Sequence, residues 1–118
     1  MTTGPPTVTL YRPVGQPELD LIAASGYRRF PPRLPEQPIF YPVCNEEYAV
    51  EIAERWNARD DGVGHVTRFA VLASYLDQFE RQIVGARHHE EYWIPADELD
   101  AFNDAIVGSI ELVQTFHR

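Results

Sequence analysis

The segment 30–38 (FPPRLPEQP) constrains the fold of this chain more than any other part of the sequence. Its four prolines remove backbone donors and bias the residues before them toward extended geometry, so the segment can be neither a helix nor a central strand. Such a stretch could serve as a ligand for an SH3-like partner. Because it lies between segments that we expect to fold, we favour a stiff loop that wraps the domain.

Regular structure is predicted before this loop. The alternation of apolar and polar residues over 8–11 predicts a first strand, and we expect Pro13 to stop it. A short helix is then predicted from Pro17 to the neighbourhood of Gly26, since proline suits a first helical turn and glycine suits a C-terminal cap. Residues 1–7 are expected to be a loose, flexible tail, with a single domain over 8–118.

The clearest helical signal follows the loop. After a short predicted strand at 39–41, Asn45 is a good N-cap for a helix over 46–56, whose apolar residues recur with the spacing of one helical face. Residues 57–62 are rich in turn formers. The remaining elements are predicted as a strand at 65–72, one helical turn at 75–79, a strand at 80–84, a polar loop at 85–91, a strand at 92–94, a helix at 97–103 and, after a break at Gly108, a strand at 110–116.

This order of elements predicts a single small α+β domain with mixed or antiparallel sheets and short helices. Its length of 118 residues and its 44% hydrophobic content suit one domain with a real core. Cys44 is the only cysteine, which excludes an internal disulfide, and no motif marks it as a nucleophile; we expect a small, half-buried thiol.

Charge and hydropathy limit the partners. The net charge of −8 disfavours non-specific binding to nucleic acid or to an anionic membrane. Arg28, Arg29 and Arg33 lie close together in the sequence, either as a solvated cluster or as a contact for an anionic ligand. No basic and apolar leader is recognisable at the start of the sequence, and its apolar runs are far too short to span a membrane. A cytoplasmic location is therefore expected. A protein partner or a homodimer stays open.

The densest chemical cluster is the segment 88–93 (HHEEYW). Three interpretations compete. Imidazole and carboxylate groups are normal zinc ligands, and His65 could join His88 and His89. However, adjacent histidines on an extended chain point to opposite faces, so we predict no metal site. The second interpretation is a solvated loop.

The third interpretation, which we favour, is a catalytic carboxylate at the junction of the loop and the next strand. A carboxylate at the rim of a cleft can orient a sugar hydroxyl and stabilise an oxocarbenium-like centre while a glycosidic bond breaks. Only one of Glu90 and Glu91 can face such a cleft from a strand. Tyr92 and Trp93 would supply a dry, aromatic wall.

Arg12, at the end of the first predicted strand, is a second candidate. A guanidinium fits phosphate oxygens bidentately, although a lone arginine is more often a surface charge. The glycine-rich phosphate loops of nucleotide-binding proteins are missing from the sequence.

Several of these segments together resemble small bacterial proteins of the ADP-ribosyltransferase-like superfamily. The segments that carry the resemblance are 10–19 (LYRPVGQPEL), 39–42 (IFYP), 46–49 (EEYA) and 91–95 (EYWIP), spread over most of the chain. Each motif is weak by itself, and their order and spacing are more specific than any one of them.

The resemblance implies roles for individual residues. An arginine on the first strand of that superfamily contacts the phosphates or ribose of NAD, and Arg12 matches it, with Tyr11 beside it in the same motif. A residue of a middle strand lies near the nicotinamide, for which Tyr41 and Thr67 are both candidates. A late glutamate binds the 2′-hydroxyl of the nicotinamide ribose and promotes loss of nicotinamide, and Glu91 matches it.

The chain also departs from the family pattern. His89 stands where members that modify arginine or asparagine carry Glu or Gln, which bears on the choice of acceptor, and the Ser-Thr-Ser triplet of many toxins is missing around Thr67. The resemblance implies a protein that uses NAD as a substrate and transfers ADP-ribose to an unknown acceptor or hydrolyses NAD, with His89 or Glu90 assisting. The alternative is a catalytically silent domain of the same fold that acts as a ligand- or protein-binding module. The enzyme requires Arg12 and Glu91 in one cleft.

Overall fold

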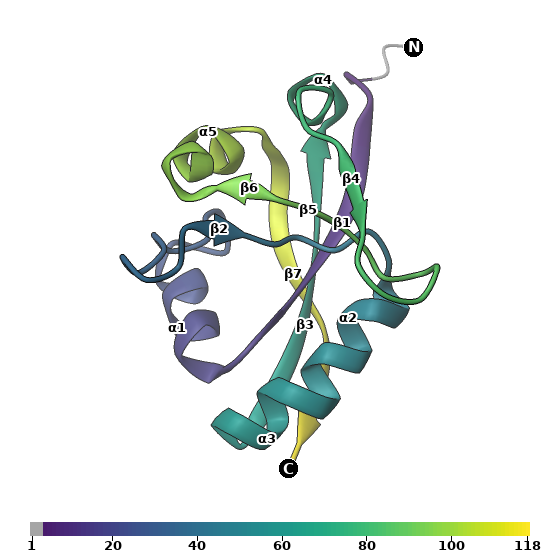
Figure 1. The fold of residues 1–118 in the computed structure, drawn as a ribbon. Helices are drawn as coiled ribbons and strands as arrows, with labels where there is room; N and C mark the ends of the chain where they lie inside the picture. Colours follow the sequence, from purple (N-terminus) through teal and green to yellow (C-terminus); the bar gives the residue numbers. More distant parts are fainter. Residues whose placement is uncertain (1–3) are drawn as a thin grey trace.

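A three-stranded antiparallel sheet forms the centre of the computed structural model, which describes residues 4–118 (Figure 1). Strand β3 (Val63–Leu72) lies in the middle, between β1 (Thr7–Val14) and β7 (Ile106–His117). Two small antiparallel pairs accompany it, namely β2 (Ile39–Phe40) with β6 (Ile94–Pro95), and β4 (Arg81–Ile83) with β5 (Glu90–Tyr92). The chain is thus an α+β domain with antiparallel sheets and short helices, as predicted.

The helices are short apart from one. They are α1 (Gln16–Ala24), α2 (Glu46–Ile52), α3 (Ala58–Asp61), α4 (Ala73–Leu76) and α5 (Leu99–Asp104), the last preceded by a 3₁₀ turn at Ala96–Glu98. A π-helical segment at Ala53–Asn57 joins α2 to α3. The three segments form one continuous helix that ends at Gly62, whose φ of 81° is left-handed. The turn-rich stretch predicted at 57–62 is therefore mostly helical.

The predicted N-cap of this helix is confirmed, because the side chain of Asn45 accepts a hydrogen bond of 2.8 Å from the Tyr48 N–H. The π-helical segment sits directly on the central sheet. A Cβ atom at Gly64 would lie 2.1 Å from the carbonyl oxygen of Ala53, so only glycine permits this close approach.

Two predicted strand boundaries are wrong. Pro13 does not stop β1, because it lies opposite Val66 on an edge strand. The N–H of Tyr11, two residues earlier, already points away from β3 and toward Val43, so the missing N–H of Pro13 belongs to the outer edge as well. Gly108 does not separate the last helix from the last strand either, because β7 already begins at Ile106. Gly108, with a φ of 81°, lies inside β7 where the register with β3 shifts.

The other predicted elements differ from the structure mainly in the residues at which they begin and end. Thr7, placed in the tail by the sequence, already belongs to β1, and residues 1–3 of that tail lie outside the described part. The segment 85–91, predicted as a loop, contains the start of β5 at Glu90. Trp93 separates β5 from β6, where the sequence predicted one strand over 92–94.

The proline-rich segment is a loop, as predicted, and its first residue anchors it. Phe30 is buried against Phe69 and Phe40, at ring-centroid distances of 4.8 and 5.1 Å. The backbone of Phe30 is bonded twice to buried Asn103 of α5, whose Oδ1 accepts from the Phe30 N–H at 2.9 Å and whose Nδ2 donates to the Phe30 carbonyl at 3.0 Å. Among residues 4–118, no helix has the length and apolar character that a membrane span requires.

Candidate functional site

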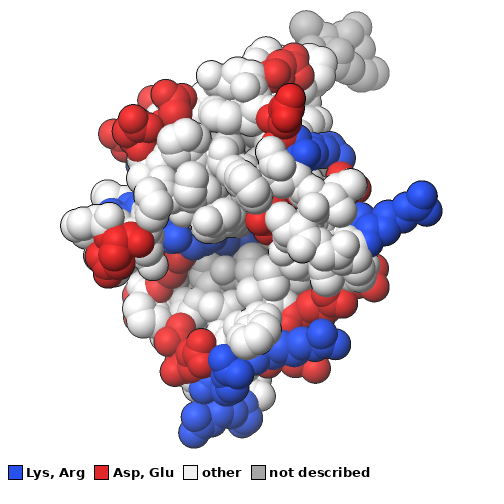
Figure 2. Space-filling view, in the orientation of Figure 1, with Lys and Arg blue, Asp and Glu red and all other residues white. Residues whose placement is uncertain are grey.

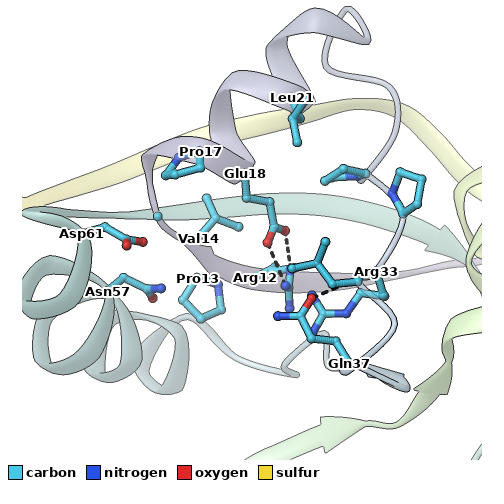
Figure 3. Close-up of a pocket in the computed structure, with 14 residues that line it drawn as sticks. Arg12, Pro13, Val14, Pro17, Glu18, Leu21, Arg33, Gln37, Asn57 and Asp61 are labelled. Atoms are coloured by element: carbon cyan, nitrogen blue, oxygen red, sulfur yellow. Dashed lines mark hydrogen bonds and ion pairs between the residues drawn. The ribbon is translucent and has the colours of Figure 1, made fainter.

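Two adjoining cavities lie on the outer side of β1, and one face of the molecule is hollowed there, with arginine and carboxylate atoms at the back of the hollow (Figure 2). The Glu91 cavity has a volume of about 480 Å³ and is lined by Arg12, Pro13, Tyr41, Val43, Ile52, Asn57, Glu91 and Trp93. The Arg33 cavity has a volume of about 410 Å³, and its lining includes Arg12, Pro13, Glu18, Arg33, Gln37, Asn57 and Asp61 (Figure 3). Arg12, Pro13 and Asn57 border both cavities, and the two cavities together are called the cleft below.

The segment 42–44 brings β1 and β5 together. Val43 exchanges backbone hydrogen bonds of 2.9 and 2.7 Å with Tyr11 of β1. On its other side the same segment bonds β5, through the Cys44 N–H to the Glu90 carbonyl and the Tyr92 N–H to the carbonyl of residue 42, each at 2.9 Å. This connection places Arg12 and Glu91, which are far apart in the sequence, at one cavity.

Glu91 is 8% exposed and its carboxylate is held by two neutral donors. The Tyr48 hydroxyl donates to Oε2 at 2.9 Å, and the Trp93 indole N–H donates to Oε1 at 2.8 Å. Burial, together with the hydrogen bond and charge of Glu91, raises the pKa of Tyr48 well above its ordinary value, so the phenol stays protonated and remains a donor. Each carboxylate oxygen keeps capacity for a further hydrogen bond.

The pleat of β5 separates the two adjacent acids. Glu90 does not line either cavity; its carboxylate pairs with Arg81 at 3.4 Å. Glu91 is therefore the acid that faces the cleft. Tyr92, expected at the wall, is 6% exposed and belongs to the core, whereas Trp93 does line the Glu91 cavity.

Arg12 is also buried, at 8% exposure, and is already paired. Its Nε and Nη2 donate to the two oxygens of Glu18 at 2.6 and 2.9 Å, which is the bidentate geometry that guanidinium and carboxylate favour. Its third nitrogen, Nη1, donates to the Tyr41 carbonyl at 3.4 Å, and the guanidinium lies 4.5 Å from the ring centroid of Phe40. Glu18 thus occupies the donor pair that the sequence assigned to phosphate.

Of the other predicted cofactor contacts, only Tyr41 reaches a cavity. It is 41% exposed and lines the Glu91 cavity. Thr67 is fully buried on β3, opposite Arg12, and its hydroxyl donates to the Arg12 carbonyl at 2.8 Å. It therefore bonds the backbone of β1 and does not line the cleft. Tyr11 packs in a small core cluster with Val43 and lines neither cavity.

The two histidines converge instead of diverging. His88 Nε2 lies 3.1 Å from Oε1 of Glu51, and His89 Nε2 lies 2.8 Å from Oε2 of the same carboxylate. The expectation that adjacent rings point to opposite faces is wrong, because the chain turns at 85–88 and is not extended there. His89 stacks on Tyr48 at a centroid distance of 4.6 Å and does not line the Glu91 cavity. It is linked to that cavity only through Tyr48, whose hydroxyl donates to Glu91.

Among the described residues, these three side chains could hold a metal ion, since their donor atoms lie within 4.8 Å of one another. In the structure they hydrogen-bond to one another, both rings to Glu51. His89 Nδ1 accepts from the Ala86 N–H at 3.0 Å, so a neutral ring carries its proton on Nε2 and donates it to Glu51. Hydrogen bonds from His88 and His89 lower the pKa of Glu51, which keeps this carboxylate ionised as the acceptor of both rings. The cluster ties the loop before β5 to α2.

Sequence reasoning missed the site roles of three residues. Tyr48 and Glu18 lie in the first turns of α2 and α1, so the sequence indicates only a contribution to helix formation and not their contacts with Glu91 and Arg12. Asn57 lies in the π-helical segment and borders both cavities, and its buried Oδ1 has no hydrogen-bond partner in the described part of the chain. Arg33 was not missed: it is one of three neighbouring arginines for which the sequence left open a solvated cluster or a contact for an anionic ligand, and it lines the Arg33 cavity.

Comparisons with known proteins do not add to this geometry. No family model matches the chain, and no curated protein or solved structure matches it significantly. The interpretation of the two cavities therefore rests on their own residues and on the motifs in the sequence.

Proposed function

We propose that this protein binds NAD in the cleft and cleaves its nicotinamide–ribose bond, passing ADP-ribose to an acceptor or to water. The observation that carries the proposal is that Arg12 and Glu91, from β1 and β5, line one cavity of about 480 Å³ together with Tyr41 and Trp93. This meets the requirement that the motif resemblance sets for an enzyme.

Glu91 is the group that would act on the sugar. When the bond between the ribose C1′ and the nicotinamide nitrogen breaks, its electron pair leaves with the nitrogen and a positive charge develops on the ribose. A fixed carboxylate stabilises that charge and accepts a hydrogen bond from a ribose hydroxyl. The Tyr48 and Trp93 donors hold Glu91 in place, so little reorganisation is needed during the reaction. An oxygen or nitrogen nucleophile then bonds to C1′.

The aromatic side chains suit the leaving group. The nicotinamide ring of NAD is a planar cation, and aromatic faces attract planar cations. Tyr41 and Trp93 are 41% and 43% exposed although both line the cavity, so their side chains are available to a ligand.

A second candidate function is ligand binding without turnover. It is favoured by the positions of His89 and Glu90, which do not line the cavity, so that Glu91 is the only carboxylate among its described lining residues. No second group is then at hand to activate an acceptor. The domain would still bind NAD or a related nucleotide.

Nicotinamide release from NAD by the purified protein tests the proposal. We expect release by the wild type. For Glu91→Gln we expect a rate at least about 100-fold lower, because the carboxylate charge is lost while the shape of the side chain remains. Glu90→Gln is the matched control, since Glu90 is the adjacent acid outside the cavity. Equal rates for wild type and Glu91→Gln would refute the catalytic proposal. Calorimetric binding of NAD without release would indicate the silent ligand-binding domain. Failure to bind NAD would refute the catalytic proposal and exclude NAD as the ligand of a silent domain.

A further inference from the structure

Arg33 is half-buried in the second cavity and has no carboxylate partner. Its Nε donates to the Ile39 carbonyl at 3.2 Å, whereas its two terminal nitrogens donate to no acceptor among residues 4–118. No acidic group within that range lies within the 4.0 Å of an ion pair with it. Burial lowers the pKa of Arg33 and the charge of nearby Arg12 lowers it further, while the charges of Glu18 and Tyr41 offset this only in part, so the net effect disfavours the cation.

The two arginines of this cavity therefore differ in what they can offer a ligand. The donor pair of Arg12 is occupied by Glu18, as Figure 3 shows, while the terminal donors of Arg33 are free within the described chain. Arg33 contacts the Ile39 carbonyl and the Phe40 ring but has no anionic partner in the described chain. A partly desolvated cation without an anionic partner costs free energy, which an incoming anion would recover. Arg33 thus supplies the uncompensated positive charge of the cleft.

The other polar groups fit the same interpretation. The remaining acid of the cavity, Asp61, lies on α3 at the end opposite Arg33 (Figure 3) and is close against Gly15. Gln37 lies beside Arg33, with its Oε1 accepting from the Leu34 N–H at 3.2 Å. Its amide nitrogen has no hydrogen-bond partner among the described residues and remains a donor. The Arg33 end of the cavity thus presents guanidinium and amide donors.

We infer that Arg33 and Gln37 form the phosphate-binding subsite of this protein, with Arg33 rather than Arg12 as the residue that binds the anion. A guanidinium donates two parallel hydrogen bonds to phosphate oxygens, and an amide N–H can donate a further hydrogen bond from another side. The inference rests on the proposed function only in taking the phosphates to be those of a dinucleotide. Because Arg12 borders both cavities, such a ligand would pass over it, with its reactive ribose near Glu91 and its pyrophosphate at Arg33. The Arg12–Glu18 pair is then a positioning pair in the floor between the two halves.

Calorimetric titration with ADP-ribose, which carries the pyrophosphate and lacks nicotinamide, tests this inference. We expect Arg33→Gln to weaken binding about 10- to 100-fold, the loss that corresponds to a charged hydrogen-bonded contact. Arg33→Lys should lie between Arg33→Gln and wild type, because it keeps the charge and loses the planar donor pair. Arg28→Gln is the matched control: Arg28 is exposed on the preceding turn, and its side chain makes no polar contact in the described structure, so affinity should stay within about twofold of wild type.

The outcomes separate the inference from the proposed function. Unchanged affinity of Arg33→Gln and Arg33→Lys, or no binding of ADP-ribose by wild type, overturns the inference whether or not NAD is cleaved. Loss of ADP-ribose binding in Arg33→Gln supports it even if wild type releases no nicotinamide, in which case the catalytic proposal alone falls. A parallel titration with inorganic phosphate identifies the source: competition at the same Arg33-dependent site with equal affinity would overturn the dinucleotide as its ligand. Thermal unfolding of each variant checks that the fold is kept, and Arg33→Lys retains the test if Arg33→Gln does not fold.

Discussion

Replacing Asn103 with alanine should destabilise the protein strongly, because this amide fastens the proline-rich loop to α5. Its side chain is 5% exposed and satisfies both the N–H and the carbonyl of buried Phe30, at 2.9 and 3.0 Å. In the variant, two buried backbone groups lose their partners. Each unsatisfied group costs about 1–3 kcal/mol, and partial access of water reduces the sum, so we expect a loss of about 3 kcal/mol in the free energy of unfolding.

A matched control lies next in the chain. Asp104 connects the same helix to Arg29, the residue before this loop, through an ion pair at 2.8 Å, and the two side chains are 73% and 43% exposed. Exposed ion pairs contribute less than about 1 kcal/mol, so Asp104→Ala should change stability little. Urea denaturation followed by circular dichroism gives both free energies on one scale. A loss of less than about 1 kcal/mol in Asn103→Ala, or equal losses in the two variants, would show that the buried amide does not anchor the loop.

Two further predictions concern the site and the pH dependence. Tyr48→Phe removes the 2.9 Å hydrogen bond to Glu91 and, under the proposed function, should slow nicotinamide release about tenfold or more. Tyr75→Phe is the control, because its hydroxyl bonds Glu98 and Tyr75 lines neither cavity; equal rates in the two variants would contradict the positioning role. Burial lowers the pKa of His65, so below its unfolded-state value the unfolded chain binds a proton that the folded chain does not. Stability from this group is complete above the unfolded-state pKa and decreases as pH falls through it, and His65→Gln should flatten that part of a pH–stability curve; an unchanged slope would assign the dependence to other groups.

Local rules were sufficient where a few neighbouring residues decide the backbone. The prolines of 30–38 exclude regular structure whatever surrounds them, and that segment is a loop. Asn45 caps α2 through an atom three residues from its partner, so its role is visible in the sequence. The antiparallel α+β class follows from many short elements of alternating type, which the predicted order already contained.

Long-range pairing decided the rest. Pro13 continues β1 because that strand is at the edge of the sheet. Glu90 and Glu91 form a strand because β4 pairs with them on one side and segment 42–44 hydrogen-bonds to β5 on the other. The motifs suggested that Arg12 and Glu91 belong to one site, but their placement at a common cavity is a property of that pairing and not of either residue's neighbours.

Side-chain partners were beyond the sequence for the same reason. Glu18 engages Arg12 because α1 folds back over β1, which leaves Arg33, in a loop with no periodicity to interpret, as the free cation of the described cleft. His88 and His89 converge on Glu51 because the chain turns before β5, where an extended strand would have separated them. The sequence determined which chemical groups the protein carries and where its backbone must bend. Only tertiary packing determined which groups meet, because a contact between distant residues depends on the packing of all the elements between them.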